Sequence, residues 1–529
     1  MRTGQRIARR ELLKRTGLAG SALTAAHLGL IGAPRRASAA TQATPAPTRG
    51  TGRLVASMNA NPQGLDPQVS SNTESFQAML AIYEQLIEYD ACTDEFYPQL
   101  AVEMPDLSNP LQYVFRLRDD VTFHDGTPLT SEDVKYTFDF VLAKGPESPA
   151  FGLYGVLDSV TAVDPHTVQF DLKLPYGLFI PYLSSIMGGI VKKGAREAQD
   201  LVKNPTGAGC GPFEFVEWIE GDHISFKRYE GYFRPELPQL AELEYRVLVE
   251  ETLRSTQLLS GEIQFSDDPS KKDVEMLMQD ENLEGAVGLS EKVNYVLLNN
   301  ANAMAGNKNF RRALSFAIDR QAILDNLFYG YGAVAHGPMR PDASWFDPRA
   351  KEIMTYDPDK AREELAASGL EGQEFDFLTQ NDPSLVEEAT LIQDMWKQVG
   401  INVNVVPIEK SAFYDNMRPG ETNWVAGLTD WSSSVLSPDY MVKLVYTSNG
   451  SYQRASYAGV DELVNQLIAT ADDAQQQELL SEIQLQMAED VPSIWIAWLA
   501  WTPVWNKSVQ GFCIAPTYYD YYDRVTVSE

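Results

Sequence analysis

The amino-acid sequence predicts an α/β fold in which mostly parallel sheets carry helices on both faces. Segments with the two-residue period of a strand alternate with segments of helical spacing. In residues 391–409, for example, a helix, a glycine stop and an alternating strand follow one another. With 529 residues and 44% apolar composition, the chain is long enough for two or three domains. Together these observations indicate a multidomain α/β protein.

Residues 113–140 give the clearest local signal. Apolar Tyr113, Phe115 and Leu117 alternate with polar or outward positions, which is typical of a half-buried strand. The sequence Asp-Gly-Thr-Pro at 125–128 then predicts a turn, because glycine readily adopts a positive φ and the ring of proline fixes the φ angle of that residue. Thr130 and Asp133 form a hydroxyl N-cap with a carboxylate at the third helical position, so a helix should begin here.

Other elements follow from the same kinds of pattern. Residues 53–58 predict a short strand, and the spacing of apolar residues over 76–86 predicts a helix. Alternation on both sides of Asp164-Pro165 predicts a hairpin. A further helix should begin at Asp357-Pro358 and end at Gly369.

The N-terminus has the features of a targeting segment. Residues 9–14 resemble the twin-arginine export motif, a modestly apolar stretch covers 17–33, and Ala37-Ser38-Ala39 fits the small-x-small cleavage rule. We therefore expect a signal peptide over 1–40, a disordered leader over 41–49 and export of the folded protein to the periplasm or the cell exterior. No cysteine precedes Cys92, so we do not expect a lipid anchor.

Charge and metal-binding residue types exclude several function classes. The formal charge is −30, and residues 1–40 carry a net +7, which leaves −37 for the rest of the chain. Such an acidic chain is not expected to bind nucleic acid, which requires a basic surface. Three cysteines (Cys92, Cys210, Cys513) allow one disulfide with one thiol left over. No histidine has metal-ligand spacing, and we expect neither a metal site nor a cofactor.

Residues 115–138, FRLRDDVTFHDGTPLTSEDVKYTF, resemble the signature of the family 5 extracellular solute-binding proteins of ABC importers. Further segments are similar to that family in the expected order, among them YEQLIEYD, PQLAVEMPD, NPTGAGCGPFEF and NFRRALSFAIDRQAILDNLFYGYG. The resemblance covers nearly everything after residue 50.

The resemblance implies a periplasmic-binding-protein fold, with two α/β lobes joined by a two-strand hinge and an extra family-specific domain. On this basis we expect lobe one at 50–82, 200–292 and 506–529, the extra domain at 83–199, and lobe two at 293–505. The chain should cross between the lobes near 293–300 and again near 498–505. Two such crossings make a hinge, because only their few residues must absorb the rotation on closure.

The stretch 427–439, GLTDWSSSVLSPD, is the most informative for the ligand. In the peptide binders of the family, an Asp three residues after the corresponding Trp anchors the α-ammonium of the peptide. Counting from Trp431, that position is Ser434 here, although Asp430 or Asp439 can still substitute. The departure moves the expectation from ordinary peptides toward neutral or differently charged solutes.

We expect solute contacts from Trp431, Ser433 and Ser434, from Asn72 in the loop region after the first strand, and from Asn300 and Trp498 near the two crossings. The tryptophans Trp495, Trp498, Trp501 and Trp505 follow closely on one another, and indole faces suit sugar rings or apolar ligand groups. For any single one of these tryptophans, ordinary core or hinge packing is the favoured explanation.

The predicted function is that of an extracytoplasmic receptor that closes on a peptide-like, opine-like or saccharide solute and delivers it to an ABC permease and its ATPase. We expect a monomer. Two alternatives remain: a receptor that serves chemotaxis or signalling, and a secreted hydrolase of oligosaccharides. The chain has neither a Gly-x-Ser-x-Gly motif nor a P-loop lysine, and we do not expect an enzyme.

Overall fold

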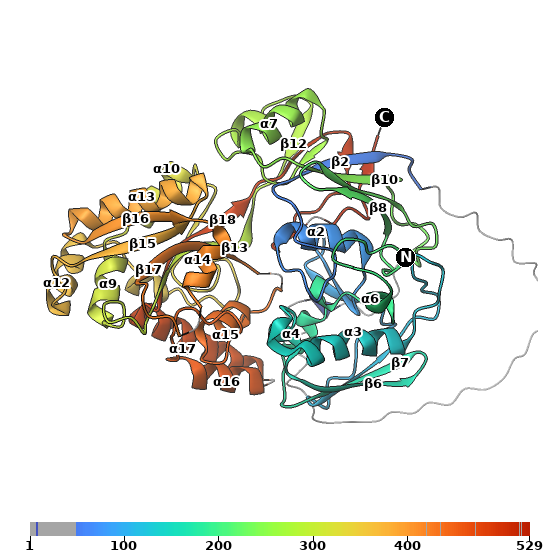
Figure 1. Ribbon diagram of the computed structural model, residues 1–529, viewed down its shortest axis with the longest axis horizontal. Helices are drawn as coiled ribbons and strands as arrows, with labels where there is room; N and C mark the ends of the chain where they lie inside the picture. The colour runs from blue at the N-terminus through green and yellow to red at the C-terminus, as the bar shows by residue number, and fades with distance from the viewer. Residues whose placement is uncertain are drawn as a thin grey trace, which may run out of the picture.

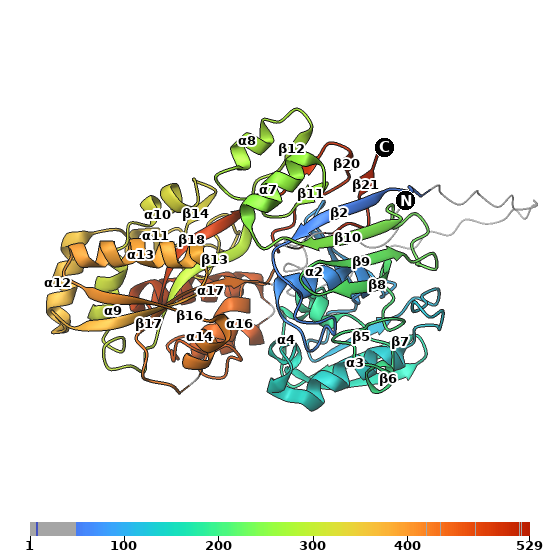
Figure 2. The ribbon, with the colours of Figure 1, turned by 45° about the horizontal axis from the view of Figure 1, so that its top comes forward.

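The computed structural model describes residues 7–8 and 49–529, except residues 419, 434, 471, 518, 520 and 529. Apart from β1 (Ile7–Ala8), the predicted signal peptide and the leader up to residue 48 therefore lie outside the described residues, as does the candidate contact Ser434. Figure 1 shows two lobes side by side, and Figure 2 shows the same arrangement after a 45° turn.

Lobe one is built on a seven-stranded sheet with the order β12-β19-β11-β2-β10-β9-β8. Its central strand β2 (Arg53–Met58) is parallel to β10 and β11. Helix α2 (Thr73–Ile82) packs against β8. The other strands are β8 (Phe213–Ile219), β9 (His223–Arg228), β10 (Glu242–Val247), β11 (Phe265–Ser266), β12 (Leu283–Gly285) and β19 (Val504–Asn506), and the further helices are α7 (Glu251–Ser260) and α8 (Val274–Met278).

Lobe two is built on a six-stranded sheet with the order β14-β18-β13-β17-β15-β16. Its strands are β13 (Gly288–Leu298), β14 (Gly332–Val334), β15 (Glu374–Gln380), β16 (Asn402–Ile408), β17 (Ala426–Ser432) and β18 (Ser493–Trp501). Its helices are α9 (Lys308–Phe316), α10 (Arg320–Leu327), α11 (Ala350–Ile353), α12 (Pro358–Ser368), α13 (Pro383–Gln398), α14 (Lys410–Asn416), α15 (Tyr440–Tyr446), α16 (Asp461–Ala469) and α17 (Asp473–Asp490).

The segment predicted as an extra domain contains a three-stranded antiparallel sheet, β5-β7-β6, and the hairpin of β3 and β4. Its elements are β3 (Ile87–Asp90), β4 (Glu95–Pro98), β5 (Gln112–Arg116), β6 (Leu157–Asp164), β7 (Thr167–Leu172), α3 (Ser131–Lys144), α4 (Phe151–Tyr154), α5 (Phe179–Tyr182) and α6 (Ala195–Ala198). The short strands β20 (Val509–Gln510) and β21 (Thr526–Val527) pair in the C-terminal segment. The bounds given above for the lobes and the extra domain stay a prediction.

Several local predictions are confirmed. The strand, turn and helix of 113–140 are β5, a turn with Gly126 at φ 82°, and α3. The Thr130 N–H donates to the Asp133 carboxylate at 2.8 Å, which is the reciprocal half of a capping box. The hairpin at Asp164 is β6 and β7, and α12 begins after its N-cap Asp357 and ends at Gly369 with φ 71°.

Two expectations differ from the structure. The helix predicted over 76–86 begins earlier and ends at Ile82, because Tyr83 has an extended backbone. The sheets are not mostly parallel: among the strands that the structure describes, only β2 with β10 and β11, and β15 with β16 and β17, pair in parallel. Short turns such as the one with Gly221 at φ 82° join neighbouring strands β8 and β9, and a tight turn can only produce antiparallel neighbours.

Two adjacent strands connect the lobes. The chain passes from β12 of lobe one to β13 of lobe two at residues 286–287, and from β18 back to β19 at 502–503. The first passage lies earlier than the predicted 293–300, and the second falls within 498–505. β13 and β18 pair antiparallel from Gly288↔Trp501 to Leu297↔Ser493. The hinge is therefore a two-stranded ribbon.

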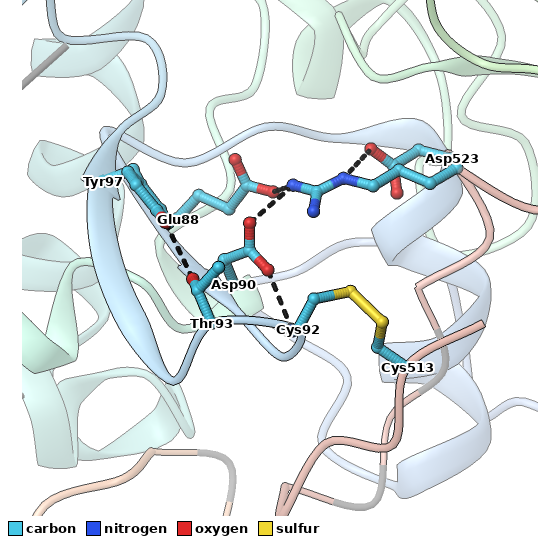
Figure 3. Close-up of a disulfide and its surroundings, with 8 residues drawn as sticks. Glu88, Asp90, Cys92, Thr93, Tyr97, Cys513 and Asp523 are labelled. Carbon is cyan, nitrogen blue, oxygen red and sulfur yellow. Dashed lines mark hydrogen bonds and ion pairs between the residues drawn. A yellow bond between two sulfur atoms is a disulfide. The ribbon is translucent and has the colours of Figure 1, made fainter. Parts of the chain in front are cut away.

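A disulfide joins Cys92, in the turn between β3 and β4, to Cys513 in the C-terminal segment (Figure 3). Arg524 reaches the same hairpin through an ion pair with Asp90 at 2.8 Å. Cys210 is a buried free thiol. The cysteine count allowed one bridge without identifying its partners, and the structure joins two cysteines that are 421 residues apart in the sequence.

Candidate functional site

The N-terminus of α2 forms the edge of lobe one that faces lobe two. Asn72 is the N-cap: its side-chain oxygen accepts from the Ser75 N–H at 3.1 Å. Its amide nitrogen donates to Glu74 at 2.7 Å and to the Asn61 carbonyl at 3.2 Å. The predicted contact Asn72 is therefore occupied in positioning the loop before α2 and the carboxylate of Glu74.

Charges of both lobes meet at this edge. Burial raises the pKa of Glu74, while Lys410 at the start of α14 and Lys292 on β13 act against that rise. Burial lowers the pKa of Lys292, but attraction to Asp430, Asp268 and Glu74 outweighs it, so that this pKa is raised. The Lys292 Nζ lies 3.7 Å from the Asp430 carboxylate. The site thus carries ionised groups of both signs.

Trp431 and Ser433 lie together at the end of β17. The Trp431 indole N–H donates to the Ser433 hydroxyl at 3.1 Å, and the half-buried ring has its centroid 5.8 Å from that of Tyr440 and 5.5 Å from that of Tyr452. Burial raises the pKa of Tyr452, and the side chain of Ser71, next to Asn72, acts against that rise. The aromatic group Trp431, Tyr440 and Tyr452 therefore reaches lobe one beside α2.

The two acids that were candidates to replace the missing Asp have different surroundings. Asp439 is fully buried, and its carboxylate accepts from the hydroxyls of Tyr176 at 2.6 Å and Tyr182 at 2.8 Å. Asp430 keeps 30% of its side chain exposed. Of the two, Asp430 is the one that a solute can reach.

Trp498 and Asn300 occupy different environments from Trp431. Trp498 lies in the same row of the sheet as Trp431, on the other side of Val293, but only 1% of it is exposed. Trp495 and Trp501 are equally buried. Asn300 follows the far end of β13, where its amide donates to the carbonyls of Leu298, Ala455 and Pro492. The structure thus brings Trp431, Ser433 and the Asn72 region together, but not Asn300.

A buried polar cluster between the extra-domain segment and α15 has no counterpart in the sequence predictions. Tyr176 and Tyr182 bind Asp439 as above, and Lys443 donates to the Tyr176 hydroxyl at 3.0 Å. Burial lowers the pKa of Lys443 to about 8, although Asp439 acts against that decrease. In Figure 1, α15 lies beside α4, and the ring contact of Tyr182 with Tyr440 spans the same boundary. The cluster ties lobe two to the segment around α4 and α5.

One cavity of about 40 Å³ lies among residues of lobe one and the extra-domain segment, away from the interlobe site, and Glu84, Gln99 and Tyr232 are among the residues that line it. Burial raises the pKa of Glu84 to about 7. This volume suits a few water molecules.

Among the described residues, no group of three or more His, Cys, Asp or Glu is placed to hold a metal ion. Within the same part of the chain, no helix has the length and apolarity to cross a membrane.

Comparisons with known proteins agree with this architecture. Residues 95–453 match the family described as bacterial extracellular solute-binding proteins, family 5. The dipeptide-binding protein of Escherichia coli K12 is 26% identical over 517 residues, covering 90% of this chain and 94% of that protein. The Helicobacter pylori DppA structure with the peptide STSA has a TM-score of 0.82 at 22% identity, covering 91% and 99% of the two chains. AgaA from A. tumefaciens R10 with agropinic acid has a TM-score of 0.80 at 22% identity, covering 90% and 99%.

Proposed function

Because this chain belongs to the bacterial extracellular solute-binding proteins of family 5, which are binding proteins and not enzymes, we propose that it is the receptor of an ABC importer. It captures its solute by closure of the two lobes and delivers it to a membrane permease driven by an ATPase. The observation that carries this proposal is that Glu74 of lobe one meets charged and aromatic residues of lobe two beside a two-stranded hinge. A solute that contacts both lobes favours the closed form by its differential affinity.

The charges of the site favour a peptide-like or opine-like solute over a saccharide. Glu74, Lys292, Lys410 and Asp430 present carboxylates and ammonium groups around the aromatic group. Ion pairs and charge-assisted hydrogen bonds recognise ionised solutes, whereas a neutral sugar desolvates such groups and brings no opposite charge to them. Trp431, Ser433 and Ser434 stay the proposed contacts. In this proposal Asn72 positions the loop before α2 and the Glu74 carboxylate, while Asn300 and Trp498 position the strands behind the contacts.

Export completes the proposal. The twin-arginine motif at 9–14 would deliver the folded protein across the membrane, and the absence of a cysteine before Cys92 in the sequence supports a receptor without a lipid anchor. The disulfide between Cys92 and Cys513 is consistent with an oxidising compartment.

The test combines solution scattering with a thermal-shift panel of dipeptides, opines and oligosaccharides. The radius of gyration should decrease, and the melting temperature should rise, with at least one peptide-like or opine-like solute. Trp431→Ala should lower the affinity for that solute about 10-fold, which corresponds to about 1.4 kcal/mol of binding free energy lost with the ring contact. Trp218→Ala is the matched control, because this half-buried indole lies on β8. An unchanged radius of gyration with every solute would refute the proposal.

A further inference from the structure

Arg454 stands out among the cations near the interlobe site. Its guanidinium carbon lies 4.7 Å from the ring centroid of Tyr414 and 5.5 Å from that of Tyr452, and the side chain is half-buried. Within the described ranges, the structure gives Arg454 neither a carboxylate partner nor a hydrogen-bond acceptor. A guanidinium has five N–H donors, and the ring faces satisfy its charge but not those donors.

The other buried or half-buried cations of the region that are named here are matched by acceptors, whereas Lys410 at the start of α14 is exposed. Lys292 lies beside Asp430, and Lys443 donates to Tyr176 next to Asp439. Arg340 donates to the Leu289 carbonyl at 2.7 Å and lies 3.3 Å from Glu291. Arg454 therefore differs from its neighbours in having donors that remain available to another molecule.

Its two aromatic supports place Arg454 at the proposed site. Tyr452 contacts Trp431 with ring centroids 5.5 Å apart, and Trp431 is one of the proposed solute contacts. Tyr414 is fixed on the other side, where its hydroxyl lies 3.3 Å from both the Thr429 hydroxyl and the Gln380 amide. Rings held in this way keep a planar guanidinium in one orientation, which reduces the entropy that it loses when it binds an anion.

We propose that Arg454 is a specificity-determining residue that binds a carboxylate of the solute through its planar fork, while the rings of Tyr414, Tyr452 and Trp431 contact the apolar part of the same molecule. This inference rests on the proposed function and narrows its solute class to acids. Arginine suits this role because its fork matches the two oxygens of a carboxylate. Lysine has the same charge but lacks both the fork and the flat surface that stacks on the rings.

The experiment measures calorimetric affinities for matched acid and amide probes. The probes are the dipeptide Met-Leu, its C-terminal amide, agropinic acid and the corresponding carboxamide. For a probe pair that the wild-type protein binds, its affinity for the acid should be about 10- to 100-fold higher than its affinity for the amide. This is the difference expected for a hydrogen bond to a charged group. Arg454→Gln should lower only the affinity for the acid, so that the preference for acid over amide falls below about 3-fold. Arg454→Lys should keep part of this preference.

Arg362→Gln is the control, because Arg362 is an exposed arginine of α12 whose ion pair with Asp359 lies outside the site. It should leave both affinities unchanged. Equal affinity of the wild-type protein for acid and amide, or an equal loss of both in Arg454→Gln, would overturn the role of Arg454 and leave the receptor function standing. Failure of the wild-type protein to bind any probe, together with no response in the wider panel, would overturn the proposed function and this inference with it.

Discussion

The buried carboxyl of Glu388 predicts a decrease in stability as the pH rises. Glu388 is 1% exposed on α13, and its only hydrogen bond among the described residues is from the Asn294 amide at 2.8 Å. Its second oxygen and the Asn294 carbonyl oxygen both lack a donor. Burial raises the pKa of Glu388 to about 7, with Asp430 adding to the rise. A protonated carboxyl can satisfy the Asn294 oxygen, whereas the ionised form cannot.

The sign follows from linkage. A carboxyl whose pKa is higher in the folded than in the unfolded chain favours folding at low pH and loses that contribution as the pH passes the folded value. The pKa of Glu388 is about 7 in the folded protein and roughly 4.5 in the unfolded chain. The free energy of unfolding should therefore decrease by about 2.5 kcal/mol between pH 5 and pH 8 because of this group.

Glu388→Gln should remove this dependence, because the amide is neutral at every pH and both donates to and accepts from Asn294. The melting temperature of lobe two should therefore fall less from pH 5 to pH 8 in the variant than in the wild-type protein. In a domain of this size, each kcal/mol of stability that the variant retains corresponds to a difference of about 2–4 °C. Differential scanning calorimetry at four pH values measures the difference. Glu387→Gln is the control, since Glu387 is the exposed neighbour on the same helix. Parallel pH curves for Glu388→Gln and the wild-type protein would refute the reasoning.

Two further predictions concern contacts that join distant segments. Because Cys92 and Cys513 close a very long loop, the double substitution to serine should cost about 2–4 kcal/mol, and reductant should lower the melting temperature of the wild-type protein but not of the variant; identical responses to reductant would contradict this. Tyr176→Phe with Tyr182→Phe removes two donors from buried Asp439, so that about 1–3 kcal/mol per donor should be lost and the solute-free protein should be less compact in scattering. Tyr136→Phe, whose hydroxyl bonds Glu197 at the surface, should change neither quantity, and a wild-type radius and melting temperature in the double variant would disprove the role of the cluster.

Local chemistry explains the parts of the fold that were predictable. The cap at Thr130, the turn at Gly126 and the stop at Gly369 each depend on residues within one or two turns of the chain. Sheet direction was not predictable in this way, because a two-residue period is the same in parallel and antiparallel strands. β2 pairs with β10 and β11, about two hundred residues away, and β13 pairs with β18 at a similar distance in sequence.

The residues of the candidate site likewise fall into those that local sequence could predict and those that depend on tertiary packing. Trp431 lies on β17 and Ser433 follows directly after that strand, so their proximity could be predicted from the sequence. Asn72 was predicted as a solute contact in the loop region after the first strand, but a polar residue just before an apolar helix is also the signal of an N-cap, and the structure uses Asn72 as one. Arg454 has no motif. Only the pairing of Tyr452 with Trp431 and the approach of Tyr414 bring it to the site, and both depend on tertiary packing.

In the proposed function, the use of Asp430 in place of the missing acid links recognition of the solute to the hinge. In the peptide binders the anchoring carboxylate is expected three residues after the tryptophan, whereas here the reachable acid is Asp430, one residue before it. On β17 that change places the carboxylate beside Lys292, which belongs to β13, one of the two strands that connect the lobes. A solute ammonium that approaches Asp430 must therefore share it with a cation on the connecting strand itself. Under the proposed function, the charge of the solute then acts directly on the strand about which the lobes close, and a neutral solute has no such effect.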